Sequence, residues 1–172
     1  MHAAHIVESL AETTNLVLTT LKNSTQETCS FKENEGSWSI FEVLEHLIMV
    51  ETGIIANLVK LGAESSNKPL ENPTTHQSVI DRSESREVKV DAPAVFQPKG
   101  LFDSIDGAMS AFQSHRDKTA QFISTNTLDL SLIAFPHPRF GMFDGNNWFS
   151  FIVGHGRRHA KQILEIKESV PK

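Results

Sequence analysis

The sequence has few of the features that mark secreted, membrane-spanning or nucleic-acid-binding proteins. Its one cysteine, Cys29, excludes an internal disulfide framework and is compatible with a reducing compartment. The formal net charge is −5, whereas proteins that bind nucleic acids generally carry a basic surface. No apolar run approaches the roughly 18 residues that a membrane span needs. We therefore expect neither a nucleic-acid partner nor a membrane span.

The N-terminal stretch MHAAHIVESLAETTNLVLTTL lacks a basic leader followed by an unbroken apolar core, so we predict no signal peptide. The chain has 172 residues, of which 39% are hydrophobic and 22% charged, and this length is enough to bury a core without disulfides. No segment repeats at a fixed period or is low in complexity. These properties favour a single cytoplasmic domain spanning residues 1–172.

Four segments show the apolar period of a helix that buries one face. Ser39 and Glu42 form a capping box that begins the second helix, and Gly62 is expected to end it. Asp144 or Asn146 is expected to cap the last helix. The predicted helices are Ala3 to about Lys22, about Ile40 to Leu61, about Leu101 to Thr125, and from this cap to about Glu168.

Residues 63–100 join the second and third helices and contain four prolines but no sustained period. A helix of 20 residues is roughly 30 Å long, and about ten extended residues cover that distance. This segment can therefore run the full length of a bundle, and its stretch REVKVDAP is compatible with a short strand. We predict an all-α, up-down-down-up four-helix bundle with this long crossover between helices two and three.

The last helix carries polar residues in the middle of its apolar stripe. Ile152 precedes them and Ile166 follows them, while His155, His159 and Gln162 lie between. Burying polar groups without partners is costly, and two imidazoles four residues apart lie on one face of a helix. The spacing is compatible with two ligands of one metal ion, and the alternative is a pair of solvated surface histidines.

His46 borders the buried stripe of the second helix, about 9 Å from the start of that helix. If the second and last helices are antiparallel, its ring comes to a similar level as those of His155 and His159. Three neutral imidazoles leave a coordination position open, which is the arrangement of catalytic zinc. Gly154 and Gly156 each cost a helix about 1 kcal/mol relative to alanine, so we expect another group to approach closely there.

Other polar residues near these stripes have weaker claims to a role. Glu51 and Gln162 are candidates to orient the ligands or to hold a bound water, although Glu51 fits the rim of the bundle equally well. His115 is expected to be a histidine at the edge of the core, with metal ligation as the less favoured alternative. Arg157 and Arg158 are expected on a solvated helix face and not in an anion site.

The segments WSIFEVLEHLIMVE and GNNWFSFIVGHGRRHAKQILEIK resemble the DinB/YfiT-like superfamily of metalloenzymes over nearly the whole chain. The resemblance carries the metal triad of that family onto His46, His155 and His159. It implies a four-helix bundle, one divalent metal ion (nickel or zinc) and a homodimer.

Family members with assigned chemistry include bacillithiol transferases and mycothiol-dependent maleylpyruvate isomerases. The resemblance therefore implies an enzyme that acts on a small molecule, as a thiol S-transferase or as a hydrolase. The alternative is a non-catalytic metal-binding or dimerisation module. An open coordination position that faces a pocket favours the enzyme, and a fourth protein ligand without a pocket favours the module.

Overall fold

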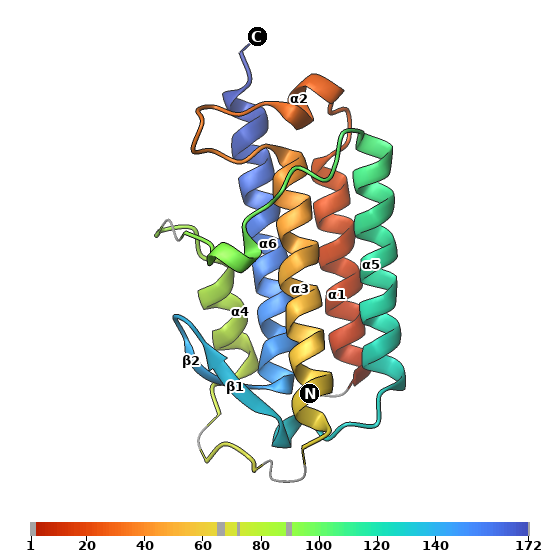
Figure 1. The fold of residues 1–172 in the computed structure, drawn as a ribbon, viewed down its shortest axis with the longest axis vertical. Coiled ribbons are helices and arrows are strands. Elements are labelled where there is room, and N and C mark those ends of the chain that lie inside the picture. Colours follow the sequence, from red (N-terminus) through yellow and green to blue (C-terminus); the bar gives the residue numbers. More distant parts are fainter. Residues whose placement is uncertain (1–2, 65–67, 72, 89–90, 172) are drawn as a thin grey trace.

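The computed structural model describes residues 3–64, 68–71, 73–88 and 91–171 of the chain (Figure 1). Its four long helices form a bundle, so the prediction of an all-α four-helix bundle is confirmed. The long helices are α1 (Ala3–Thr20), α3 (Ile40–Gly62), α5 (Ile105–Thr125) and α6 (Gly145–Ser169). None of the helices in the described ranges has the length and apolar character that crossing a bilayer requires.

Helices α1 and α6 run in one direction, and α3 and α5 run in the other (Figure 1). At the end of α6, the Lys167 ammonium donates to the carbonyls of Thr20 and Lys22 at the end of α1. Helix α1 packs against α5 and α6, and α3 packs against the same two helices. Helix α6 therefore contacts both α1 and α3 along the bundle.

The start of α3 has the capping box that the sequence predicts. The Ser39 hydroxyl accepts from the Glu42 backbone N–H, and the Glu42 carboxylate accepts from the Ser39 backbone N–H at 2.8 Å. Lys32 donates to the same carboxylate at 2.6 Å. The link before this cap holds a short helix that the sequence analysis missed, α2 (Gln26–Ser30).

The crossover between α3 and α5 contains two helices that were not predicted, α4 (His76–Glu84) and the 3-10 helix η1 (Ala94–Phe96). Thr75 caps α4, which packs along α6. The strand expected in REVKVDAP is absent from its described residues 86–88 and 91–93, and residues 89–90 lie outside the described part of the chain. Helix α5 begins at Ile105 instead of Leu101 because Ser104 caps it.

A hairpin precedes α6, where the sequence analysis expected an irregular connector. Strand β1 (Ala134–His137) pairs antiparallel with β2 (Gly141–Asp144), and Gly141 has a positive φ of 84° at the start of β2. The short 3-10 helix η2 (Leu130–Leu132) comes before β1. Asp144, and not Asn146, caps α6 by accepting from the Asn147 backbone N–H at 2.8 Å.

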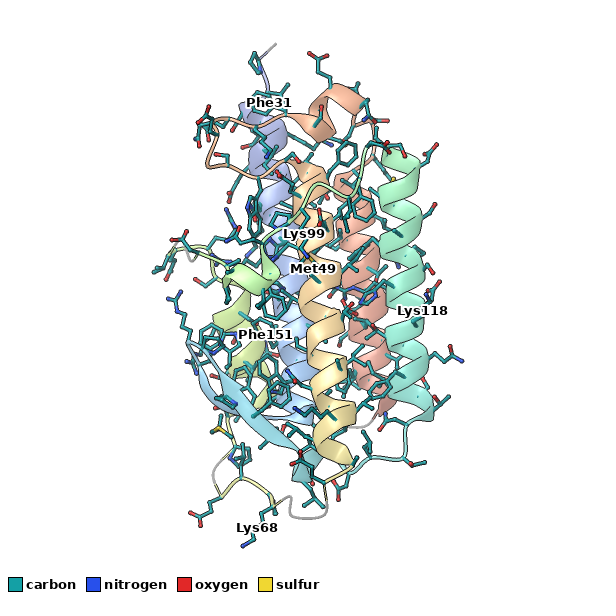
Figure 2. All side chains as sticks on the ribbon, in the orientation of Figure 1. Phe31, Met49, Lys68, Lys99, Lys118 and Phe151 are labelled. Atoms are coloured by element: carbon teal, nitrogen blue, oxygen red, sulfur yellow. The ribbon has the colours of Figure 1, made fainter. Side chains whose placement is uncertain are left out.

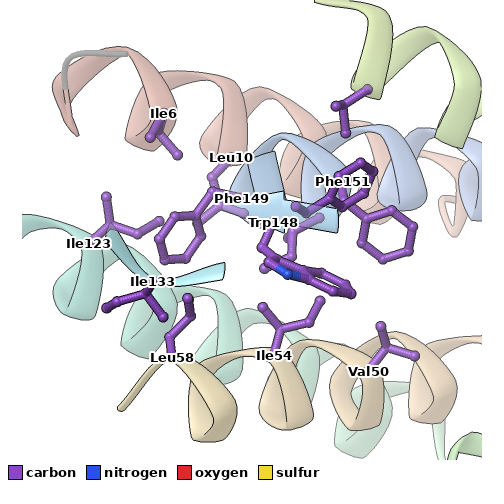
Figure 3. Packing of buried hydrophobic residues seen from close by; sticks show 13 residues of the cluster. Ile6, Leu10, Val50, Ile54, Leu58, Ile123, Ile133, Trp148, Phe149 and Phe151 are labelled. Atoms are coloured by element: carbon purple, nitrogen blue, oxygen red, sulfur yellow. The ribbon is translucent and has the colours of Figure 1, made fainter. Parts of the chain in front are cut away.

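The apolar core consists of two clusters along the bundle. Figure 3 shows the first, in which Trp148 and Phe149 of α6 meet Ile54 and Leu58 of α3 and Ile123 of α5. The second cluster includes Val17, Leu44, Phe112 and Ile163. Along α6, His155 and His159 lie between the residues of the first and the second cluster, and on α3 His46 lies next to Leu47 of the second cluster.

Candidate metal centre

Three histidines from two helices converge inside the bundle. His46 comes from α3, and His155 and His159 come from α6. One ligand nitrogen from each ring lies within 4.8 Å of those of the other two. The ring centroids are 5.2 Å apart for His46 and His155, 4.9 Å for His46 and His159, and 4.4 Å for His155 and His159. The structure thus brings together the three residues that the sequence analysis singled out.

Hydrogen bonds on the outer side of two rings decide which nitrogen faces the centre. His46 Nδ1 lies 2.8 Å from the Phe96 carbonyl oxygen, and His159 Nδ1 lies 2.8 Å from Gln162 Oε1. Because both oxygens accept, we assign the proton of each ring to Nδ1, which leaves a lone pair on Nε2. His155 Nε2 lies 3.0 Å from His159 Nε2. The Nε2 atoms of His155 and His159 therefore face each other, and one ring nitrogen of His46 lies within 4.8 Å of a nitrogen of each.

Burial keeps these rings neutral. Desolvation lowers the pKa of His46 below its ordinary value of 6.5. Desolvation is also the main cause that holds the pKa values of His155 and His159 well below 6.5, and the neighbouring imidazoles and Arg158 lower them further. Neutral imidazole is the form that binds metal ions. At neutral pH all three rings are accordingly in the form that can act as ligands.

Two aromatic side chains flank the histidines. The Trp38 ring lies 4.7 Å from that of His46 and is stacked 6.4 Å from that of His159. The Phe151 ring is stacked 4.9 Å from that of His155, and Figure 2 shows Phe151 on the part of α6 near α4 and the hairpin. These rings reduce contact with water on two sides, whereas His155 keeps partial exposure to solvent.

The crossover reaches the site because a buried carboxylate binds its backbone. Glu45, the neighbour of His46, accepts from the backbone N–H groups of Lys99, Gly100 and Leu101 at 2.7, 2.9 and 3.0 Å. Figure 2 shows Lys99 where the crossover passes α3. This anchor lies close in the chain to η1, whose last residue, Phe96, supplies the carbonyl that binds His46.

The sequence analysis missed this role of Glu45, although one signal was present. Glu45 is a charged residue beside the buried apolar stripe of the second predicted helix, and it is 2% exposed in the fold. Such a residue requires partners. Gly53 gives the Phe96 ring room, because a Cβ at this position would lie 2.9 Å from that ring and would push it aside.

The expectation of a solvated face at Arg157 and Arg158 is wrong. The Arg158 guanidinium donates to the carbonyl oxygens of Ser85 and Val88, and Arg157 pairs with Glu84 at 3.5 Å. Both arginines are half-buried; Arg157 connects α6 to the end of α4, and Arg158 connects it to the segment that follows α4. Their role in the fold is to attach the crossover to the helix that carries two of the three histidines.

Glu51 faces α5, and the contacts that the structure records for it are with that helix. Its Oε2 lies 3.1 Å from Arg116 Nε, and its Oε1 lies 3.9 Å from His115 Nε2. Glu51 is 2% exposed, so the alternative that placed it at the rim is wrong. Five residues at 100° each turn it about 140° away from His46 around α3. Among the described residues, the group of possible ligands contains three histidines and not His115.

The two glycines of α6 are sites of close approach, as predicted. A Cβ at Gly154 would lie 2.5 Å from the Ile80 carbonyl oxygen of α4 and closer still to Ser83 Oγ. A Cβ at Gly156 would lie 2.5 Å from Thr13 Cγ2 and 3.2 Å from Arg116 Nη2. Helix α6 therefore contacts α4 at the residue before His155, and it contacts α1 and α5 at the residue after it.

Comparisons with known proteins agree with this architecture. Residues 9–163 match the model of the DinB superfamily. The chain belongs to the DinB superfamily. YuaE of Bacillus subtilis, an uncharacterized protein, is 28% identical over 151 residues, which are 87% of this chain and 90% of YuaE. The resemblance of the sequence motifs to the DinB/YfiT-like superfamily is thereby confirmed.

A solved structure has a fold similar to that of this DinB superfamily protein. YfiT from Bacillus subtilis is described as a probable metal-dependent hydrolase with an unusual four-helix bundle topology. The match has a TM-score of 0.63 and covers 96% of this chain and 86% of YfiT, at 16% sequence identity. At this identity the likeness shows a shared fold, and the chemistry has to be inferred from the site itself.

Proposed function

We propose that this DinB superfamily protein is a divalent-metal-dependent enzyme that acts on a small molecule, with His46, His155 and His159 as the metal ligands. One observation carries the proposal: three neutral imidazoles each place one ring nitrogen within 4.8 Å of those of the other two. The outer nitrogens of two rings are already committed to Phe96 and Gln162, as second-sphere partners of metal-ligating histidines generally are.

The donor set fits zinc or nickel. Imidazole suits both ions, whereas a site rich in carboxylates would favour magnesium or calcium. No cysteine, aspartate or glutamate among the described residues joins the three histidines. Three protein ligands leave a position open, which supports the enzyme over the non-catalytic module. A divalent ion bound here would act as a Lewis acid and lower the pKa of a water or thiol that it binds.

The residues around the histidines prepare them for this role. The Phe96 carbonyl and Gln162 hold Nδ1–H of their rings, which fixes both tautomer and orientation. Trp38 and Phe151 exclude water from two sides, and electrostatic interactions are stronger in such an environment. The partial exposure of His155 identifies the side from which a small substrate can approach.

Two reactions are compatible with this site. In hydrolysis, the oxygen of a water forms a bond to an electrophilic carbon, the bond to the leaving group breaks, and the proton of the water leaves with that group. In S-transfer, the sulfur of a low-molecular-weight thiol of the bacillithiol or mycothiol type attacks in the same way. The description of YfiT supports hydrolysis, and the motif resemblance supports S-transfer.

A paired screen separates these reactions. The metal-loaded protein is assayed with small esters and amides, and separately with a low-molecular-weight thiol and an electrophile. We expect turnover in one arm, at least about 100-fold weaker in His155→Ala, because the ligand is lost. His5→Ala is the matched control, since His5 is an exposed histidine on α1 and should leave the rate unchanged. A protein that binds one metal ion tightly but turns over nothing in either arm would favour the module.

We further propose that the protein is a homodimer, on the basis of the motif resemblance, and that it is cytoplasmic, on the basis of its composition and its single cysteine. The chain has a mass of 19.1 kDa. Light scattering on the metal-loaded protein should therefore give about twice this mass. A mass that stays at the value of one chain over a wide range of protein concentration would contradict the dimer.

A further inference from the structure

The crossover contains a turn whose backbone N–H groups converge on one carboxylate of α3. Between η1 and α5, the N–H groups of Lys99, Gly100 and Leu101 all donate to Glu45, at 2.7, 2.9 and 3.0 Å. Gly100 has a positive φ of 76°, and a left-handed residue of this kind lets successive N–H groups point to the same side. Such a turn is a binding site for an anion, and here a side chain of the protein itself supplies the anion.

The Glu45 carboxylate depends on this turn. It is 2% exposed, and none of the ion pairs recorded for the described residues includes it. A buried carboxylate is costly unless hydrogen bonds replace the water that it loses. Hydrogen bonds to a charged acceptor are also stronger than those between neutral groups. The position of the turn is therefore coupled closely to that of the carboxylate.

His46, the next residue of α3, holds the same segment at a second point. Its Nδ1 lies 2.8 Å from the Phe96 carbonyl oxygen, three residues before Lys99. The other hydrogen bonds recorded for residues 96–101 within the described ranges go to residues 92–94 of the crossover itself. Two neighbouring side chains of α3 therefore make the recorded hydrogen bonds between this segment and the bundle.

We infer that Glu45 is a positioning residue for the metal centre: it holds the turn at residues 99–101, which fixes the Phe96 carbonyl and so orients the His46 ring. The carbonyl accepts the Nδ1 proton, and Nε2 keeps its lone pair for a metal ion. This inference rests on the proposed function, in which His46 is a ligand. Without the carboxylate the carbonyl can move away, and the ring can then rotate or carry its proton on Nε2.

Two variants release the turn in different ways. Glu45→Gln keeps the size of the side chain, but its amide NH₂ would face at least one of the three N–H donors. Gly100→Ala keeps the carboxylate and strains the turn, because alanine disfavours a φ of 76° although its Cβ would meet nothing within 4 Å. The controls are Glu42→Gln, at a carboxylate of α3 that accepts the Ser39 N–H, and Gly141→Ala, at a φ of 84° in the hairpin.

NMR of the metal-free protein with ¹⁵N-labelled histidine shows which nitrogen of His46 carries the proton, at about pH 8, where imidazole is neutral. The His46 signals are identified by their loss in His46→Ala. We expect the Nδ1–H tautomer alone in the parent and in both controls, and a mixture with Nε2–H in Glu45→Gln and Gly100→Ala. Competition titration with Zn²⁺ should show about tenfold weaker binding in these two variants and an unchanged affinity in the controls.

A purely structural role of Glu45 would lower the free energy of unfolding and leave the tautomer of the folded protein as it is. The Nδ1–H tautomer alone in both variants would therefore overturn the inference, and so would a tautomer mixture with unchanged Zn²⁺ affinity. If Glu45→Gln fails to fold, Gly100→Ala decides, because it leaves α3 intact. A parent that binds no Zn²⁺ would refute the proposed function, whereas the tautomer would still decide whether Glu45 positions His46.

Discussion

Replacing Glu51 alone should destabilise the protein far more than replacing Glu51 and Arg116 together. The two side chains are each 2% exposed, and their charged atoms lie 3.1 Å apart. Glu51→Leu leaves the Arg116 cation buried without its carboxylate, which costs about 3–5 kcal/mol. In the double variant Glu51→Leu/Arg116→Met, both charges are replaced by apolar groups of similar size. Such replacements are neutral or stabilise by about 1–4 kcal/mol.

Urea unfolding followed by circular dichroism measures these free energies, and a cycle that includes Arg116→Met gives the coupling between the two residues. Glu12→Leu on the exposed face of α1 serves as the control and should change the free energy of unfolding by less than about 0.5 kcal/mol. The double variant should also keep its metal, because the recorded contacts of Glu51 are with α5. Additive single effects would refute the buried pair, and loss of metal would mean that Glu51 supports the site.

Three further predictions follow from the same contacts. Gln162→Ala should weaken metal binding by about tenfold and less than the loss of a ligand, because His159 Nδ1 loses its acceptor; Gln162→Glu, which keeps an acceptor, should bind as the parent does. Gly154→Ala should cost about 1–3 kcal/mol in urea unfolding, since its Cβ overlaps α4, whereas Gly36→Ala in an open loop should not. Acidification from pH 6.5 toward 4 should lower stability by on the order of 1–3 kcal/mol, because burial lowers the pKa of His137 to about 4 and the unfolded chain then takes up the proton first. His137→Phe should make this slope shallower without removing it, because the pKa values of His46, His155 and His159 are also lowered, and an unchanged slope would assign it to other groups.

Metal binding should persist to lower pH than free imidazole would allow. The sequence suggests that protons compete near the ordinary histidine pKa of 6.5. In the fold, desolvation holds the pKa values of His155 and His159 well below this value. The rings stay neutral as the pH falls through 6.5, so the loss of metal should begin below it.

The parts of the fold that the sequence predicts are those specified by local chemistry. Ser39 and Glu42 bind each other's backbone within one turn, so the start of α3 can be read directly. Helix α4 was missed because few of its side chains are apolar; it is held by Thr75 at its start and by the room that Gly154 leaves on α6. The hairpin was missed because Pro136 and its neighbours resemble a loop.

The same distinction applies to the site. The histidines could be predicted because His155 and His159 share a helix face and His46 borders a buried stripe. The partner of His46 is the backbone carbonyl of Phe96, 50 residues away. Every residue has such a carbonyl, so the pattern of side chains in the sequence cannot predict which one binds His46. Five helical steps place Glu51 about 140° from His46 around α3, which the helical angle alone indicates, and only the fold shows that it contacts α5. A role of Glu51 in the metal site stays a prediction.

The metal content of the purified protein tests the central claim most directly. Elemental analysis, on protein made without a histidine tag, should find about one divalent ion per chain in the parent and in His5→Ala. His46→Ala, His155→Ala and His159→Ala should each bind metal at least about tenfold more weakly. Replacing a residue that only hydrogen-bonds to a ligand already lowers metal affinity by roughly 10–100-fold, and losing the ligand itself should cost no less. Equal metal content in the parent and in all three variants would contradict the site.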